Sequence, residues 1–215
     1  MQEAFRTRRG SIGGTSQLRI LSRGHRLAAA AVLVSGLGAA LPASRTSAES
    51  IANQVVESAP PRVFDIFLTR LMAAESGGRT NAKNPRLSAL GPFQFIKRTF
   101  LDVARRHFLA EIAGLTEEEI LELRTDPELS RRAAAAVCRE SVDYFKEQGL
   151  KPTFSHLRLA FLLGPADAAR IMHAQQRTPV MRLLSPAVIK ANPFMRRMSV
   201  SDLLAKSERD VSTRG

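Results

Sequence analysis

Cysteine is almost absent from this sequence, and so are the patterns of β-structure and of repeat proteins. The 215 residues include one cysteine, Cys138, so no disulfide bond can form within the chain. Cys138 lies in the alanine-rich run RRAAAAVCRESVDYF, which predicts a small buried residue rather than a nucleophile. No segment alternates apolar and polar residues over a useful length, and neither a heptad seam nor a fixed repeat is present. These absences favour an all-α domain over a sheet, a coiled coil or a solenoid.

A metal-binding pattern is also absent. His107, His156 and His173 have neither the spacing of metal ligands nor a nucleophile placed beside them by a motif. Each is therefore expected to be a packing or surface residue, and no metal or cofactor is expected.

Positive charge is present in excess, but it is dispersed. The formal net charge is +12, and residues 1–48 account for half of it with seven arginines and one glutamate. The remainder has 25 basic and 19 acidic residues, without a basic run interleaved with aromatic residues. This distribution disfavours nucleic acid as a partner. The moderate positive charge itself suits a polyanionic cell-wall polymer as well as it would suit a nucleic acid.

The N-terminal segment has the pattern of an export signal. A basic leader precedes the apolar run LAAAAVLVSGLGAALPAS, which is short and rich in small residues for a membrane span. Residues 1–48 are therefore predicted to be a secretory signal that directs the protein to the periplasm, with Ala43 and Ala48 as cleavage points. A retained membrane anchor through residues 27–43 and an ordinary core helix are the alternatives.

The rest of the chain is predicted to hold one helical domain. Residues 49–60 are expected to form a linker, residues 61–206 the domain and residues 207–215 a polar tail. Helices are expected at 61–75, 92–109, 116–123, 127–148, 153–163, 165–175, 179–184, 186–191 and 199–206.

The helix starts are predicted from proline and from capping residues. Proline at the first helical position loses no hydrogen bond, so a loop residue followed by proline indicates a helix start. Such steps occur at Pro60-Pro61, Gly91-Pro92, Asp126-Pro127, Gly164-Pro165, Thr178-Pro179 and Ser185-Pro186. Two capping boxes are also predicted, Thr116 with Glu119 and Thr125 with Glu128.

A single acid stands at the end of the first predicted helix, PRVFDIFLTRLMAAES. Glu75 follows Leu71 by four residues and Leu68 by seven, so its carboxylate lies over the apolar face of the helix. Partial burial there should raise its pKa, as a general acid near neutral pH requires. The alternative is that Glu75 only ends the helix, although a glutamate in a last turn interacts slightly unfavourably with the helix dipole.

The loop after Glu75 has the composition of a cleft wall. Gly77 and Gly78 let the chain turn directly after the acid. Asn81, Asn84 and Ser88 can bond the local backbone or a hydroxyl-rich ligand.

The next predicted helix adds ligand-binding candidates in its first turn. Gly91 opens it, the amide of Gln94 can meet a ligand, and the ring of Phe93 can support a sugar. Phe93 also belongs to an apolar stripe with Ile96 and Phe100, so at least part of it is expected in the core.

Together these residues resemble the signature of soluble-lytic-transglycosylase-type domains, which are similar to goose-type lysozymes. That signature has a Glu-Ser pair, a loop ending in Ser and Ala, and Gly-x-x-Gln. The matching positions are Glu75 and Ser76, Ser88 and Ala89, and Gly91 and Gln94. A second family element, Ala-Tyr-Asn-x-Gly-Pro, is similar to AFLLGP at residues 160–165. Phe161 stands in place of its tyrosine and Leu162 in place of its asparagine. The resemblance covers roughly residues 62–175.

The resemblance implies a lysozyme-like fold and a peptidoglycan lyase without a cofactor. Glu75 would protonate the glycosidic oxygen between N-acetylmuramic acid and N-acetylglucosamine, then act as base on the 6-hydroxyl to close a 1,6-anhydro ring. Ser76 would orient this carboxylate, and the glycan strand would be the partner. The sugar subsites would be lined by Ser88, Gly91, Phe93, Gln94, Phe161 and Gly164.

Two alternatives remain within cell-wall chemistry. A hydrolytic muramidase would need a second carboxylate about 6.5–9.5 Å from Glu75. The acids available for that role are Asp102, Glu111, Asp143 and Asp167. The departures at Phe161 and Leu162 leave open a wall-binding module that has lost turnover.

Overall fold

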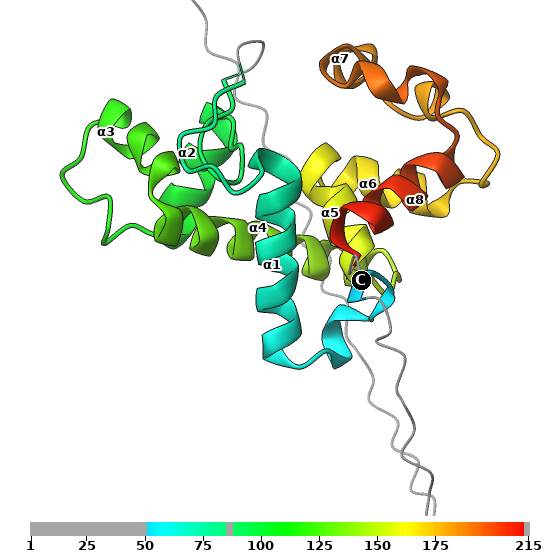
Figure 1. The fold of residues 1–215 in the computed structure, drawn as a ribbon, viewed down its shortest axis with the longest axis horizontal. Helices are drawn as coiled ribbons and strands as arrows, with labels where there is room; N and C mark the ends of the chain where they lie inside the picture. Colours follow the sequence, from blue (N-terminus) through cyan, green and yellow to red (C-terminus); the bar gives the residue numbers. More distant parts are fainter. Residues whose placement is uncertain (1–50, 85–87, 213–215) are drawn as a thin grey trace, which may run out of the picture. The chain divides into compact units, whose positions relative to one another are not determined.

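The computed structural model describes residues 51–84 and 88–212, and this part of the chain is mostly helical (Figure 1). The helices are α1 Pro61–Ser76, α2 Lys97–His107, α3 Glu117–Glu122, α4 Pro127–Glu147, α5 Phe154–Leu163, α6 Pro165–His173, α7 Pro186–Ala191 and α8 Val200–Val211. Short 3-10 helices are η1 Ile51–Asn53, η2 Val56–Ser58, η3 Leu123–Thr125, η4 Val180–Arg182 and η5 Pro193–Arg197. The described residues contain no strand, which confirms the all-α prediction.

The predicted secretory signal or anchor lies outside the described residues. Within 51–84 and 88–212, no helix combines the length and the apolar character needed to cross a bilayer.

Most of the proline signals mark helix starts as predicted. Pro61, Pro127, Pro165 and Pro186 are the first residues of α1, α4, α6 and α7. Two signals do not: Pro92 lies in a turn and α2 begins only at Lys97, and Pro179 precedes the 3-10 helix η4, which begins at Val180.

One of the two predicted capping boxes is confirmed. Thr116 accepts a hydrogen bond from the backbone of Glu119, whose carboxylate bonds the backbone of Thr116 in return. The box predicted at Thr125 is wrong, because the adjacent Asp126 caps α4 by accepting from the backbone N–H of Leu129 at 2.6 Å. A carboxylate at the N-cap satisfies an otherwise unpaired N–H group and interacts favourably with the helix dipole.

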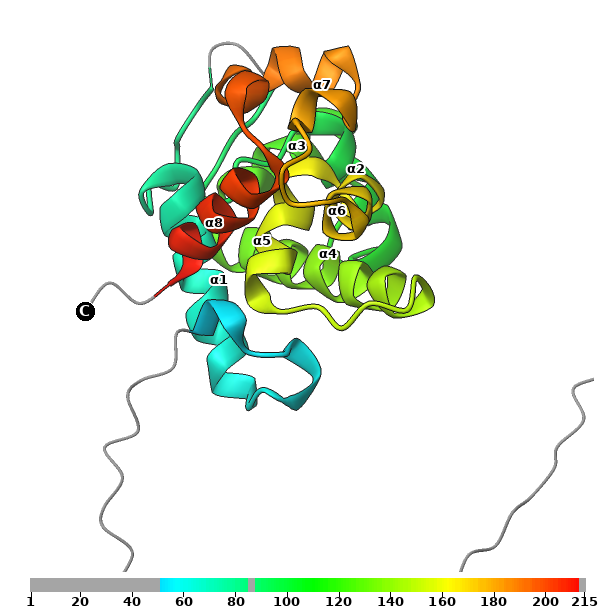
Figure 2. The same cartoon turned by 90° about the vertical axis from the view of Figure 1, so that its right-hand side faces the viewer.

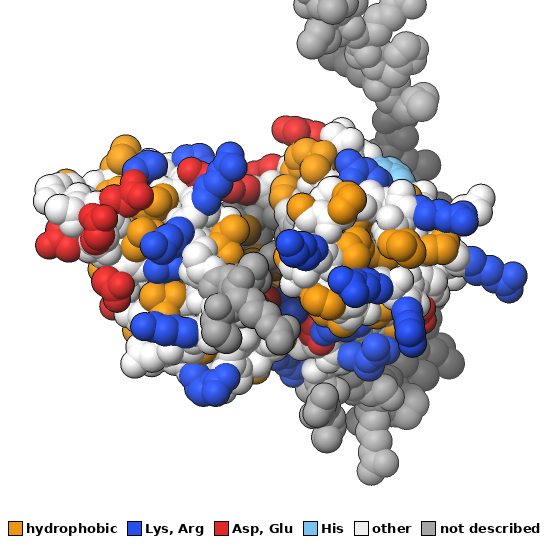
Figure 3. Space-filling view, turned by 90° about the horizontal axis from the view of Figure 1, so that it is seen from above, with side chains coloured by type: hydrophobic (Ala, Val, Ile, Leu, Met, Phe, Trp, Pro, Cys, Tyr) orange, Lys and Arg blue, Asp and Glu red, His pale blue; other side chains and the backbone are white. Residues whose placement is uncertain are grey.

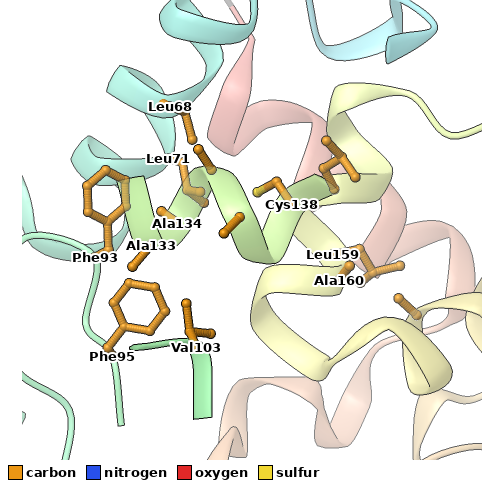
Figure 4. Packing of buried hydrophobic residues seen from close by; sticks show 14 of the residues in the cluster. Leu68, Leu71, Phe93, Phe95, Val103, Ala133, Ala134, Cys138, Leu159 and Ala160 are labelled. Atoms are coloured by element: carbon orange, nitrogen blue, oxygen red, sulfur yellow. The ribbon is translucent and has the colours of Figure 1, made fainter. Parts of the chain in front are cut away.

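Helix α4 lies at the centre of the helical core. It packs against α1 and α2 towards one side and against α5 and α6 towards the other (Figures 1 and 2). Its alanines have short side chains, so the neighbouring helices and the segment before α2 can approach closely. Figure 4 shows this packing around Leu68, Leu71, Phe93, Phe95, Val103, Ala133, Ala134, Cys138, Leu159 and Ala160. Cys138 is buried as predicted, and its burial raises the pKa of the thiol to about 12.

The two ends of the helical unit extend beyond the predicted domain boundaries. Ile51 and Ala52, predicted to lie in a linker, are buried against the core. Helix α8 continues to Val211 instead of ending near residue 206, and Arg70 of α1 donates a hydrogen bond to the Val211 carbonyl at 3.0 Å. Both segments are therefore part of the packed unit.

Candidate functional site

Glu75 is the penultimate residue of α1, at the point where the chain leaves the helix. Gly77 ends the helix in the left-handed region with φ 65°, and its N–H bonds the carbonyl of Ala73 at 2.9 Å. Glycine adopts this conformation without steric cost, so the chain can turn away directly after the acid. The Glu75 side chain is 17% exposed, which leaves it at the edge of the core and within reach of solvent.

Two other helices supply charged partners for Glu75. Arg158 of α5, only 5% exposed, donates from Nη1 to Glu75 Oε1 at 2.9 Å. The same guanidinium donates from Nε to Asp210 Oδ2 of α8 at 3.0 Å. Lys206, one turn before Asp210, donates to its two carboxylate oxygens at 2.8 and 2.9 Å. Glu75, Arg158, Asp210 and Lys206 therefore form one connected network of alternating charge.

The pKa of Glu75 lies above its usual value, as its position in the sequence predicts. Burial is the largest cause, because a desolvated carboxylate holds its proton more tightly. The charge of Arg158 and its hydrogen bond lower the pKa, the negative charge of Asp210 raises it, and Lys206 lowers it. By pairing with Arg158, Asp210 also offsets part of the positive charge that would otherwise hold Glu75 fully ionised.

Asp210 is not placed as a second catalytic carboxylate. Both acids bond one guanidinium, through nitrogen atoms that share a single carbon, so Arg158 lies between them. An inverting hydrolase instead needs open space for a water molecule between its two carboxyl groups.

The sequence offers Asp102, Glu111, Asp143 and Asp167 as a possible second carboxylate. None of them is among the charged groups that shift the pKa of Glu75. Three of them pair with arginines elsewhere: Asp102 with Arg98, Glu111 with Arg132, and Asp167 with Arg170.

Gly91 allows the loop after Glu75 to pass very close to a second segment. Its φ is 87°, and a Cβ atom at this position would lie 1.8 Å from the carbonyl oxygen of Arg124. Arg124 is itself 4% exposed, and its guanidinium donates to the carbonyls of Ser88 at 2.7 Å and Phe95 at 3.3 Å. A side chain at residue 91 would displace this arginine and the loop that it holds.

Gln94 adopts a conformation that is uncommon for a residue with a side chain. Its φ is 51°, the one positive value among the described non-glycine residues. The amide nitrogen donates to the carbonyls of Ala82 and Gly91, each at 2.9 Å, and so ties the two ends of the loop together. Strained backbone of this kind often occurs at functional sites. The amide nitrogen is engaged within the loop, whereas the sequence suggested contact with a ligand.

Two serines predicted at the site bond backbone atoms in this structure. The Ser76 hydroxyl donates to the Met72 carbonyl at 3.2 Å, within its own helix. The exposed Ser88 accepts a hydrogen bond from the backbone N–H of Lys97 at 3.3 Å. Arg158, rather than Ser76, is the side chain that contacts the Glu75 carboxylate.

The aromatic candidates lie deeper than a sugar platform would. Phe93 is 0% exposed and packs in the core, so its ring has no face open to a ligand. Phe161 is half-buried, and its ring meets that of Phe95 edge-on at 5.6 Å between centroids. Gly164, with φ 86°, ends α5 and precedes Pro165 at the start of α6.

A pocket lies in the loop that follows Glu75, although Glu75 is not among the residues that line it. It has a volume of about 540 Å³ and is lined by the loop residues 78–83. Its walls include Arg79, Thr80, Asn81 and Lys83, whose side chains offer hydrogen-bonding groups to a polar ligand. The described residues contain no cluster of His, Cys, Asp or Glu able to hold a metal ion.

Arg158 and Asp210 were not identified from the sequence. Arg158 could have been, because it is the one fully charged residue in the apolar helix FSHLRLAFLL, and a charge buried there requires a partner. Asp210 lies in the segment that the sequence predicts to be a polar tail, where one acid among several charged residues carries no distinguishing signal.

Comparison with known proteins does not assign this chain to a family. The chain matches no protein-family model, and no curated protein matches it significantly.

Proposed function

We propose that this protein is a peptidoglycan lytic transglycosylase with a lysozyme-like domain, in which Glu75 is the sole acid and base. The observation that carries the proposal is the environment of Glu75. The carboxylate is partly buried, has a raised pKa, and stands at the head of a loop that lines a pocket. Among the described residues, the acid nearest to it in the charge network is already held by Arg158 and Lys206.

In the proposed reaction, the protonated Glu75 donates its proton to the glycosidic oxygen as the bond to the muramyl C1 breaks. The resulting carboxylate then takes the proton of the muramyl 6-hydroxyl, whose oxygen bonds C1 and closes the 1,6-anhydro ring. The proton returns to Glu75, so the cycle consumes no water and needs only one carboxyl group.

Arg158 has a defined part in this cycle. Its hydrogen bond of 2.9 Å to Glu75 stabilises the carboxylate that exists between the two proton transfers. Asp210 holds the guanidinium in place from the other side at 3.0 Å. Arg158 is thus a positioning residue for the carboxylate.

A wall-binding module without turnover is the second candidate, and the same ion pair favours it. A buried arginine stabilises the ionised form of Glu75, whereas a general acid must carry a proton. The two candidates differ in whether the glycosidic bond is broken.

The test compares two charge-neutral substitutions in digests of purified sacculi. Glu75→Gln should abolish anhydro-muramyl products while the protein still binds the wall. Glu111→Gln, which removes an exposed carboxylate paired with Arg132, should keep full activity. Intact strands from the wild-type protein would support the binding module, and cleavage by Glu75→Gln would refute the assignment of the acid.

A further inference from the structure

The chain between α6 and α8 carries positive charge without any acidic residue. No Asp or Glu occurs between Asp167 and Asp202. We call residues 174–199, which join the two helices, the cationic cap. Its cations are exposed and form no ion pair with any residue in the described part of the chain: Arg177, Arg182, Lys190, Arg196 and Arg197. On the face seen in Figure 3, Lys, Arg and hydrophobic side chains gather over the part that contains α6, α7 and α8.

Elsewhere in the described residues, some arginines have acidic partners and others, such as Arg62 and Arg79, form no ion pair. Arg105 and Arg106 of α2 bond Glu117 and Glu140 at 3.1 and 2.9 Å. The cap differs from the rest of the domain because its own segment contains no acidic residue that could pair with its cations.

Exposed apolar side chains accompany these cations. Met181 on η4 is 57% exposed and Phe194 on η5 is 46% exposed, and η4 packs against η5. Aromatic residues, methionine and arginine are enriched where proteins bind partners, whereas isolated exposed apolar residues are common. The combination of an aromatic ring, a methionine and unpaired arginines indicates a binding surface.

The cap is connected to the candidate site through side-chain contacts. The Lys206 ammonium lies 5.5 Å from the centre of the Phe194 ring. The same ammonium bonds Asp210, which bonds Arg158, which bonds Glu75. Phe194 of the cap is thus linked to Glu75 through Lys206, Asp210 and Arg158.

We propose that the cationic cap binds the carboxylate-bearing stem peptides of the glycan strand whose sugar backbone enters the Glu75 site. This inference rests on the proposed function, because it takes peptidoglycan as the substrate. The stem peptides carry free carboxylates, which complement arginines that have no acidic partner. Phe194 provides an apolar contact beside them. Continuity with the Glu75 site favours this occupant over an anionic membrane or a nucleic acid.

Binding to immobilised glycan strands, with and without their peptides, tests the cap. The full chain carrying Glu75→Gln is used as the parent, so that strands are not cleaved during the measurement. The parent should bind peptide-bearing strands more tightly than strands stripped by an amidase. Arg196→Gln with Arg197→Gln should weaken binding to peptide-bearing strands by about fivefold. Binding to stripped strands should not change.

A matched control removes two exposed arginines outside the cap. Arg62→Gln with Arg98→Gln lowers the net charge by the same amount and should leave the preference for peptide-bearing strands intact. Equal loss in both double variants would overturn the proposal, because total charge rather than the cap would then govern binding. Phe194→Ala should reduce binding to peptide-bearing strands without lowering the thermal midpoint by more than a few degrees.

The outcomes separate this inference from the proposed function. If the wild-type protein releases anhydro-muramyl products and the cap variants bind both kinds of strand like the parent, the cap proposal fails and the function stands. If no product forms but the preference for peptides depends on Arg196 and Arg197, the function fails and the cap stands. Cap-dependent binding to anionic vesicles, with no preference for peptide-bearing strands, would also overturn the cap proposal.

Discussion

Arg158 contacts both acids of the candidate site, and its burial makes it costly to remove. A neutral side chain at this position would leave Glu75 and Asp210 facing each other without a cation. Breaking a buried ion pair by removing one partner costs about 3–5 kcal/mol of folding stability. Substitution of Arg158 therefore changes stability and chemistry together, and Asp210, which bonds Arg158 rather than Glu75, is the better residue to test.

Asp210→Asn should shift the pH dependence of activity to lower pH. The negative charge of Asp210 raises the pKa of Glu75, so its removal lowers that pKa. A general acid is active in its protonated form, and activity is lost as pH rises through the pKa. The alkaline limb of the profile for anhydro product formation should therefore move down in pH.

The control for this prediction lies on the same helix. Glu208→Gln makes the same charge change two residues earlier, where the carboxylate bonds Asn53 at 2.8 Å. It should leave the alkaline limb where it is in the wild-type protein. An upward shift in Asp210→Asn, or equal shifts in the two variants, would contradict the assigned network.

Gly91→Ala should abolish the loop conformation beside the site. Positive φ alone penalises the alanine by about 1 kcal/mol. The added Cβ would also lie 1.8 Å from the Arg124 carbonyl oxygen, a distance that the backbone can relieve only by moving. We expect both the free energy of unfolding and the activity to fall.

Gly114→Ala isolates the steric part of that effect. Gly114 has a similar φ of 80°, but a Cβ there would meet nothing within 4 Å. Denaturant unfolding of both variants should show the larger loss for Gly91→Ala. Equal losses would show that the approach of residue 91 to Arg124 is unimportant.

At the level of whole elements, the C-terminal part of α8 connects the candidate site to α1 and α5. It supplies Asp210 to Arg158, and its Val211 carbonyl accepts a hydrogen bond from Arg70 of α1 at 3.0 Å. Deletion of residues 207–215 should therefore destabilise the domain by at least about 2 kcal/mol, since it also removes the buried Val211. Activity should be lost with it.

A shorter deletion provides the comparison. Removal of residues 213–215 keeps α8 complete and should leave the unfolding midpoint and the activity unchanged. Full activity after deletion of 207–215 would show that α8 contributes nothing to the site beyond Lys206.

Several helices that begin with a local start signal were predicted correctly. Proline at the first helical position located α4 at Pro127 and α7 at Pro186 without reference to the rest of the fold. The second helix was placed five residues too early, because the loop around Gly91 and Gln94 is held by Arg124. That contact is distant in the chain, so no local pattern indicates it.

In the candidate site, too, local features were predicted from the sequence and contacts between distant residues were not. The spacing of residues along one helix was enough to predict that Glu75 is partly buried over the apolar face and that its pKa is raised. Its actual partner, Arg158, lies 83 residues away, and Asp210 lies a further 52 residues along the chain. Pairings of this range are set by how α1, α5 and α8 pack, which composition and periodicity do not specify.

At the level of the whole described unit, the site depends on the complete core. Glu75, Arg158 and Asp210 come from α1, α5 and α8, and α5 packs against both α8 and α4 at the centre. These three helices are far apart in the sequence. The site therefore forms only when the helices between residues 61 and 211 are folded together.

Digestion of sacculi in water enriched in heavy oxygen tests the central claim most directly. With Glu75 as sole acid and base, the muramyl 6-hydroxyl closes the ring, so mass spectrometry should find anhydro-muramyl ends without the heavy isotope. Glu75→Gln should give no such ends. Reducing muramyl ends that carry the heavy isotope would show that water attacks the sugar, and would contradict the account.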